Sequence, residues 1–263
     1  MITAPSRYRL AGIVLACGLL GACAQVPADP AARAAHAEAN DPAEPTNRAI
    51  FAGNQWVDRN AIRPVAQVYT DHVPQRVRSS VRNFARNLQG PGTLINDALQ
   101  GNFERAWITA QRFAVNSTLG GLGLFDVATD WDLPGHQSDF GQTFGVWGAG
   151  PGASVQLPLF GASNLRDTAG RVVGMVANPL GFVSGETFQT VQAVGTTMGM
   201  VGQRADALPI TNDLERSSLD YYAALRSLAA QRRAALVAEG RAGVPARAGA
   251  PAAPESLAEE SHR

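Results

Sequence analysis

The chain has 263 residues, and its 22 basic residues balance its 22 acidic ones. A formal net charge of zero removes the global electrostatic case for nucleic acid, so we expect no nucleic-acid partner. Only 17% of the residues are charged and 27 are glycine, a composition that suits a protein in contact with an apolar phase but also many soluble domains.

The N-terminus predicts a cleaved signal peptide over residues 1–22. Arg7 and Arg9 supply the positive start, and the uncharged run that follows is shorter than a bilayer-spanning helix. The run ends in Leu20-Gly21-Ala22-Cys23, where small residues precede a thiol, as in a bacterial lipobox. We therefore predict cleavage before Cys23 and a lipid anchor on its sulfur. An ordinary secretory peptide and an N-terminal anchor helix are the alternatives.

Cysteine usage fits this processing. Cys17 and Cys23 are the only cysteines, so the mature chain keeps one, and that one is acylated. An intrachain disulfide, a thiolate zinc site and a cysteine nucleophile are then excluded. Ala24 stands where an aspartate would favour retention at the inner membrane of a Gram-negative cell, so it points to the outer membrane.

Composition divides the mature chain into three parts. Residues 23–40 are rich in alanine and read as a tether from the lipid. Residues 240–263 are rich in alanine, proline, glycine and glutamate and nearly lack large apolar residues, so we predict a disordered tail. The folded part is then 41–239, enough for one large domain or two small ones.

The first strong helical pattern follows Pro74, which favours a helix start. Apolar residues then recur at spacings of four, three and four: Val77, Val81, Phe84 and Leu88. Beside that face runs a stripe of arginines: Arg78, Arg82 and Arg86. The stripe is either a solvated helix surface or a row of headgroup contacts at a bilayer interface. Gly90-Pro91-Gly92 predicts the end of this helix, with a short separate helix ending at Gly101.

Further elements follow in order. Asn102 is a candidate cap for the next helix, and 117–152 is rich in turns. Val155–Leu159 is the best extended segment, and Ser163 can cap a helix after it. The last helix is predicted over roughly 212–238, capped by Asn212.

Residues 172–203 carry a single charge, Glu186, and are interrupted by Asn178-Pro179 and glycines. No window is apolar enough for a membrane-spanning helix. A buried hairpin in a soluble core and a hairpin lying in one membrane leaflet both fit. Glycine pairs four residues apart permit close helix contact here: Gly170/Gly174 and Gly195/Gly199.

Catalytic and metal-binding patterns are scarce. His36 and His262 fall in the tether and tail, and His72 and His136 read as lone surface histidines. No Gly-x-Ser-x-Gly or His-Glu-x-x-His motif occurs. An aspartate group lacks the spacing of a calcium loop and is better explained by capping and turns: Asp126, Asp130, Asp132 and Asp139. We expect no metal, no cofactor and no enzymatic activity.

An ordered set of strings resembles the VacJ/MlaA family of outer-membrane lipoproteins. The match runs over about 41–180 and more loosely to about 235. The residues that carry it are Asp41, Pro42, Asn47, Arg48, Arg63, Pro64, Arg112, Phe113, Asn116, Asp126, Asp139, Gly141, Arg166 and Asp167. Each string is weak alone, and their order along the chain makes the set specific.

The resemblance implies an all-α fold, mainly a ring or bundle of helices with very little strand. It implies a monotopic protein in the inner leaflet of the outer membrane, with a central amphipathic channel and often a trimeric porin beside it. Such a protein removes phospholipids that have strayed into the outer leaflet and passes them to a soluble periplasmic lipid carrier. The helical faces and the absence of a nucleotide motif agree with transfer that needs no catalysis.

The chain departs from the family pattern at Pro45 and at Gly53-Asn54, near a hairpin that the resemblance associates with channel opening. Gly53 and Asn54 are therefore candidate channel or gating residues. The candidate leaflet or headgroup contacts are Arg78, Arg82, Arg86 and Glu186. A porin-bound structural scaffold without lipid transfer is the main alternative, and a lipid hydrolase is a third.

Overall fold

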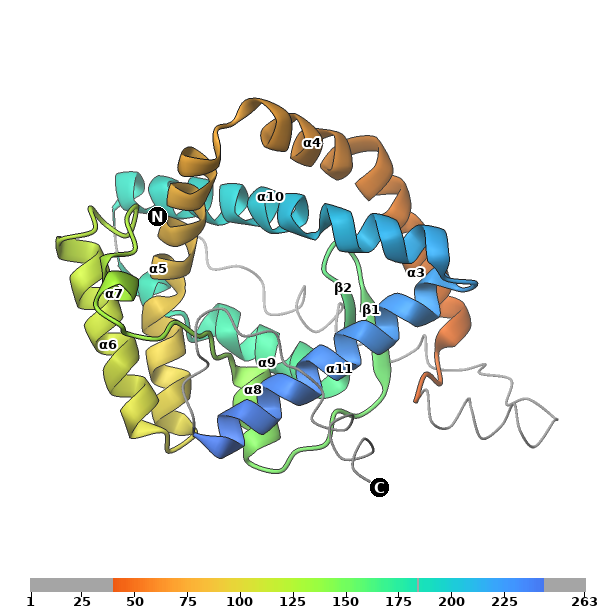
Figure 1. The fold of residues 1–263 in the computed structure, drawn as a ribbon. Helices are drawn as coiled ribbons and strands as arrows, with labels where there is room; N and C mark the ends of the chain where they lie inside the picture. Colours follow the sequence, from red (N-terminus) through yellow and green to blue (C-terminus); the bar gives the residue numbers. More distant parts are fainter. Residues whose placement is uncertain (1–39, 184, 244–263) are drawn as a thin grey trace, which may run out of the picture.

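The computed structural model describes residues 40–183 and 185–243; Cys23, the signal peptide, the tether to residue 39 and the tail from 244 lie outside those ranges. The described residues form a ring of helices with one two-stranded sheet (Figure 1). The all-α prediction is confirmed. The helices are α3 (Glu44–Val57), α4 (Arg63–His72), α5 (Gln75–Leu99), α6 (Phe103–Thr118), α7 (Val127–Asp130), α8 (Phe140–Val146), α9 (Leu165–Val176), α10 (Glu186–Ser217) and α11 (Tyr221–Ala242). The π-helical segment η1 (Asp58–Ile62) joins α3 to α4, and the 3-10 turn η2 (Pro179–Phe182) follows α9.

Helix α5 corrects the predicted break at Gly90-Pro91-Gly92, because it continues through Pro91 to Leu99. A proline inside a helix removes one backbone hydrogen bond, so packing must compensate. Gly90 lies against α6, and a Cβ there would be 2.9 Å from Cδ2 of Phe113. The close α5–α6 contact therefore holds together a helix that local propensity would interrupt.

The rest of the ring closes through small residues. On α10, a Cβ at Gly195 would meet Phe84 Cε1 at 2.4 Å, and a Cβ at Gly199 would meet Ala85 Cβ at 2.6 Å. Because neither glycine has a side chain, α5 can pack closely against α10 at both positions, as the spacing predicted. The other face of α10 packs on α4 around the buried cluster Ala66, Tyr69, Ala205 and Leu208.

Helices α8 and α9 approach even more closely. A Cβ at Gly170 would lie 2.1 Å from the backbone nitrogen of Gly141, so only glycine fits there. Gly174, one turn along, would place a Cβ at an ordinary 3.6 Å from Phe140. Of the predicted pair, Gly170 makes the close contact and Gly174 does not.

The extended segment predicted at 155–159 forms most of β1 (Ser154–Leu157) and continues into the following turn. Strand β1 pairs antiparallel with β2 (Gly161–Asn164), with Val155 opposite Ser163. Asn54 on α3 binds the end of β1 and the turn that follows it, donating to the Leu157 carbonyl at 2.9 Å and accepting from the Leu159 amide at 2.8 Å. Asn164, not Ser163, caps α9.

The last two helices also differ from the prediction. Helix α10 runs through Pro209 to Ser217, so Asn212 lies inside it and caps nothing. Asp220 caps α11, accepting a hydrogen bond from the Ala223 amide. Helix α11 continues to Ala242, so the boundary of the predicted tail at 240 lies too early.

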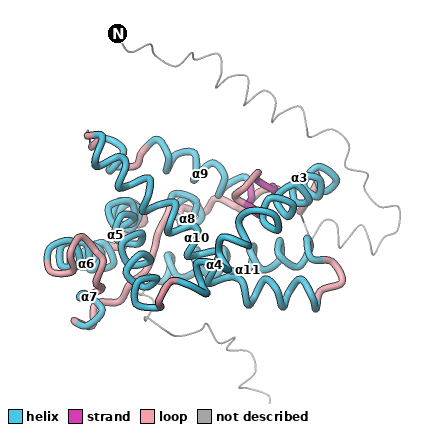
Figure 2. Tube along the Cα trace, turned by 90° about the horizontal axis from the view of Figure 1, so that it is seen from above, coloured by secondary structure: helices cyan, strands magenta, loops and turns pink. Residues whose placement is uncertain are grey.

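Large apolar side chains gather on the outside of the ring. Trp107 is 66% exposed and Phe103 is 73% exposed, both on α6, which lies beyond α5 at one end of the molecule (Figure 2). Trp56 on α3, at the opposite end, is 68% exposed. The fully buried side chains, in contrast, include Arg105, Gln142 and Asp97. In the described ranges, none of the helices combines the length and apolarity needed to cross a membrane.

Candidate functional site

The ring encloses a cavity of about 2070 Å³. One face of α10 contributes a row of residues at helical spacing: Gln192, Thr196, Gly199, Gln203, Ala207 and Ile210. The same cavity receives Leu88 and Phe113 from α5 and α6, and Met175 from α9. Small-molecule pockets usually measure about 300–1,000 Å³, so this space suits a larger, amphipathic ligand.

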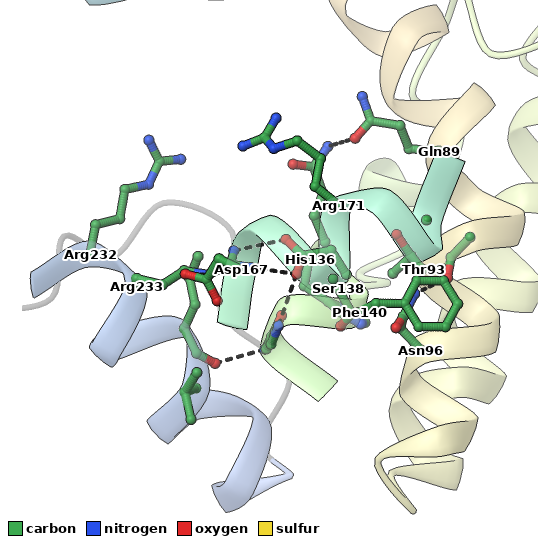
Figure 3. Close-up of a pocket in the computed structure, with 18 of the residues that line it drawn as sticks. Gln89, Thr93, Asn96, His136, Ser138, Phe140, Asp167, Arg171, Arg232 and Arg233 are labelled. Atoms are coloured by element: carbon green, nitrogen blue, oxygen red, sulfur yellow. Dashed lines mark hydrogen bonds and ion pairs between the residues drawn. The ribbon is translucent and has the colours of Figure 1, made fainter. Parts of the chain in front are cut away.

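A polar cluster on α8, α9 and α11 forms one wall (Figure 3). Arg233 donates to Asp139 from Nη1 at 2.8 Å, and its Nε lies 2.8 Å from Oδ2 of Asp167. Arg166 binds the other oxygen of Asp167 at 2.8 Å. Asp139 also caps α8 through the Gln142 amide, so this cluster ties three helices together.

This cluster predicts sensitivity to acid. Burial acts to raise the pKa of Asp139, but the hydrogen bond and the charge of Arg233 outweigh it and hold the pKa below its usual range. A carboxylate whose pKa is lower in the folded chain stabilises the fold above its unfolded pKa, near 4, and loses that contribution as the pH falls through the folded value. We expect the melting temperature to be steady above about pH 5 and to fall below about pH 4.

The variant Asp139→Asn tests this expectation by circular dichroism. It should melt at a lower temperature than the parent at pH 7, and its melting temperature should fall less steeply with acid. Equally steep falls in the two proteins would contradict the role of Asp139 in acid sensitivity.

A second cluster corrects the interpretation of His136 as a surface histidine. Its side chain is 3% exposed, and Nε2 lies 2.8 Å from Oδ2 of Asp97. Thr109 donates to the same oxygen at 2.8 Å, and Ser138 donates to Oδ1 at 2.6 Å. Ser138 thus binds the carboxylate and not the histidine, which differs from the serine–histidine contact of a nucleophile and its base. The cluster joins the segment before α8 to α5 and α6.

A third cluster holds the turn-rich segment. Arg112 on α6 binds both oxygens of Asp126, at 2.7 and 2.9 Å. Asn116 adds a donor to Asp126 at 3.0 Å and accepts from the Ala128 amide at 2.9 Å. Asp126 also caps α7. Asp126 and Asp139 are helix caps, as the sequence favoured, and the structure adds their ion pairs with arginine. The described ranges hold no His/Cys/Asp/Glu group suited to a metal ion.

Comparisons with known proteins match this architecture. The sequence model of the family described as MlaA lipoprotein matches residues 39–236. The chain belongs to the MlaA lipoprotein family.

Relatives agree with this assignment. The intermembrane phospholipid transport system lipoprotein MlaA of Shigella flexneri is 32% identical over 231 residues, covering 86% of this chain and 87% of that protein. The protein of the same name from Escherichia coli K12 is 35% identical, covering 62% and 64%. A Rickettsia felis protein is 35% identical, covering 76% and 79%.

A solved structure also matches, described by the words "Structural basis for maintenance of bacterial outer membrane lipid asymmetry". It aligns with a TM-score of 0.65 at 32% identity and covers 75% of this chain and 98% of that chain.

The MlaA motif near the N-terminus closes the ring onto α11. Asp41 is buried and accepts hydrogen bonds from Asn47 at 2.7 Å and Arg226 at 2.6 Å, and from the Tyr222 hydroxyl. Burial and the hydrogen bond to Asp41 raise the pKa of Tyr222. Arg48 adds an ion pair with Asp220.

Other residues of the family pattern also make helix-start, ion-pair or packing contacts. Pro64 lies in the first turn of α4, and Arg63 pairs with Glu215 at 2.8 Å. Phe113 packs on Gly90, and Gly141 admits α9. Pro42 lies just before α3.

The structure separates the predicted site residues. Gly53 and Asn54 lie on α3 and do not line the cavity, so their role in gating stays a prediction. Of the arginine stripe, Arg82 pairs with Asp206 on α10, and only Arg86 lines the cavity. The headgroup role of the stripe and of Glu186, which starts α10, stays a prediction.

Sequence reasoning missed five of the cavity arginines: Arg171 on α9, and Arg226, Arg232, Arg233 and Arg241 on α11. Each lies in an ordinary amphipathic helix, and no spacing relates one helix to the other. Their position becomes visible only when α9 and α11 face the same cavity.

Proposed function

We propose that this chain transfers phospholipid, without catalysis, through the cavity of its helical ring. It takes phospholipids mislocalised in the outer leaflet of the outer membrane and hands them to a soluble periplasmic carrier. The single observation that carries the proposal is a cavity of about 2070 Å³ with both polar and apolar residues in its lining. A phospholipid needs apolar surroundings for its tails and a polar wall for its headgroup.

Helix α10 supports a lipid pathway by its two faces. The cavity side presents Gln192, Thr196 and Gln203, whereas Val191 and Val194, both exposed, do not line the cavity. The cavity side also carries the apolar residues Met200 and Ile210, so this helix offers the cavity both polar and apolar surface. This mixture favours an amphipathic lipid inside the ring, and the two exposed valines favour apolar surroundings at that part of the helix.

The outer surface supports a monotopic position in the inner leaflet of the outer membrane, anchored through Cys23. Exposed apolar residues continue from α6 into the following turn, at Leu119, Leu122 and Phe125. Patches of this kind mark membrane or protein contacts. A trimeric porin beside the ring would cover part of this surface, and a scaffold without lipid transfer is the competing function that the same surface allows.

Filling the cavity tests the proposal. Thr196→Trp combined with Ala230→Trp places two indoles inside, because both positions line the cavity and are exposed to it. The matched control is Thr197→Trp with Ala235→Trp, on the same two helices but outside the lining. We expect the first pair to fail, and the control to succeed, in restoring low outer-leaflet phospholipid to a strain lacking the protein.

The readout is lipid hydrolysis by externally added phospholipase. Full rescue by a stably expressed cavity variant would contradict transfer through the cavity. A normal outer leaflet in the deletion strain, with the protein still retained on porin, would favour the scaffold.

A further inference from the structure

Arginine residues outnumber aspartate and glutamate residues in the cavity wall. Eight arginines line the cavity: Arg86, Arg112, Arg166, Arg171, Arg226, Arg232, Arg233 and Arg241. Among residues 40–183 and 185–243, only four acidic residues do so: Asp126, Asp139, Asp167 and Glu239. The wall therefore carries an excess of positive charge although the whole chain is neutral.

Each of the four acids already has an arginine partner. Asp126 binds Arg112, and Arg233 binds both Asp139 and Asp167. Glu239 lies 3.4 Å from Arg105. In the described part of the chain, every acidic side chain of the lining therefore already pairs with an arginine other than Arg86, Arg171 or Arg232.

Three lining arginines have no hydrogen bond or ion pair with another residue in 40–183 and 185–243. They are Arg86, Arg171 and Arg232, whereas the other five bind a carboxylate or, in Arg241, the Gly145 carbonyl. The contrast is sharpest on α11, where Arg233 turns to Asp167 while its neighbour Arg232 extends away from the cluster (Figure 3).

Arg171 is held by an aromatic ring and makes no ion pair with a described residue, although its charge also acts on Asp139. Its guanidinium carbon lies 5.0 Å from the centre of the Phe160 ring, a cation–π contact that leaves the N–H edges available. In Figure 3 the Arg171 and Arg232 heads extend to the same side of α9 and α11. A guanidinium matches the two oxygens of a phosphate, and the attraction is stronger beside apolar walls than in water.

We propose that Arg171 and Arg232 form a phosphate-binding site in the cavity wall that takes the phosphodiester of a glycerophospholipid. The inference rests on the proposed function and names the contact that holds the lipid headgroup. Because the arginines bind the phosphate and not its substituent, phosphatidylethanolamine and phosphatidylglycerol bind alike.

Native mass spectrometry of the mature lipoprotein in a neutral sugar detergent tests the site. The probes are dioleoyl phosphatidylglycerol, dioleoyl phosphatidylethanolamine, inorganic phosphate, and dioleoylglycerol, which has the same tails and no phosphate. Arg171→Gln with Arg232→Gln should bind both phospholipids roughly ten- to a hundredfold more weakly and dioleoylglycerol as the parent does. The double lysine variant should recover part of the affinity, and Arg216→Gln, 75% exposed and outside this cavity, should change nothing.

The outcomes separate the two proposals. Equal phospholipid binding by parent and double glutamine variant, with unchanged melting temperatures, overturns the phosphate site and leaves lipid transfer standing. A parent that binds no phospholipid overturns the proposed function. If that parent still binds inorganic phosphate through Arg171 and Arg232, the lipid assignment is overturned and the site serves free phosphate.

Discussion

Asp97→Ala is expected to lower the free energy of unfolding by about 3–5 kcal/mol, because it removes a fully buried carboxylate from its partners. Asp97 is 0% exposed and accepts hydrogen bonds from Thr109 and Ser138 while contacting His136. Arg105, also 0% exposed, lies 4.0 Å away. Alanine would leave buried donors without their acceptor and a buried cation without this counter-charge.

Thermal unfolding of the detergent-solubilised protein, followed by circular dichroism, measures this effect. A loss of this size lowers the melting temperature of a chain this long by roughly 10 °C. Asp71→Ala, the same change at an exposed aspartate on α4, should shift it by no more than about 2 °C. Equal melting temperatures for the two variants would show that the hydrogen bonds around Asp97 do not stabilise the fold.

Arg105→Met separates the ion pair from the hydrogen bonds. The methionine removes the buried cation and fills much of the space, while Asp97 keeps Thr109, Ser138 and His136. We therefore expect a smaller loss than for Asp97→Ala. A larger loss for Arg105→Met would mean that the Arg105 side chain contributes more to stability than the hydrogen bonds accepted by Asp97.

The sequence predicted helices correctly where apolar residues recur at helical spacing. It predicted helix ends wrongly where contacts with residues distant in the sequence determine them. The spacing of Val77, Val81 and Phe84 indicated α5. Its continuation past Pro91 depends on Phe113 of another helix, which no local pattern contains. Asn212 and Asp220 are both suitable caps by residue type, and only Asp220 lies at a helix start.

The site was less predictable for the same reason. Capping predicted Asp126 and Asp139 correctly, because a cap and its helix are neighbours in sequence. The partner of His136 is Asp97, 39 residues away in the sequence, and no local spacing relates the two residues. Cavity membership of Arg171 depends on helices that meet only in the folded ring.

Gly170→Ala is expected to be the most damaging single-methyl change in the ring. The added Cβ would lie 2.1 Å from the nitrogen and 2.5 Å from the Cα of Gly141, and these backbone atoms cannot rotate away. Overpacking of a core costs about 1–3 kcal/mol, and a clash with backbone belongs at the upper end. Helices α8 and α9 must separate, and this separation shifts both Asp167 and the phosphate-binding Arg171, because both lie on α9.

Gly174→Ala is the matched control on the same helix. Its Cβ would meet Phe140 Cδ2 at 3.6 Å, an ordinary contact, so the variant gains the roughly 0.5–1 kcal/mol by which alanine exceeds glycine in a helix. Gly170→Ala should therefore be less stable than the parent and Gly174→Ala more stable, with about 3.5–4 kcal/mol between the two variants. The same pair tests the transfer route, because Gly170→Ala should also weaken phospholipid binding while Gly174→Ala should preserve it. Equal melting temperatures and equal phospholipid affinities for the two variants would show that the close α8–α9 contact at Gly170 is not required. The position of Arg171 would then not depend on that contact.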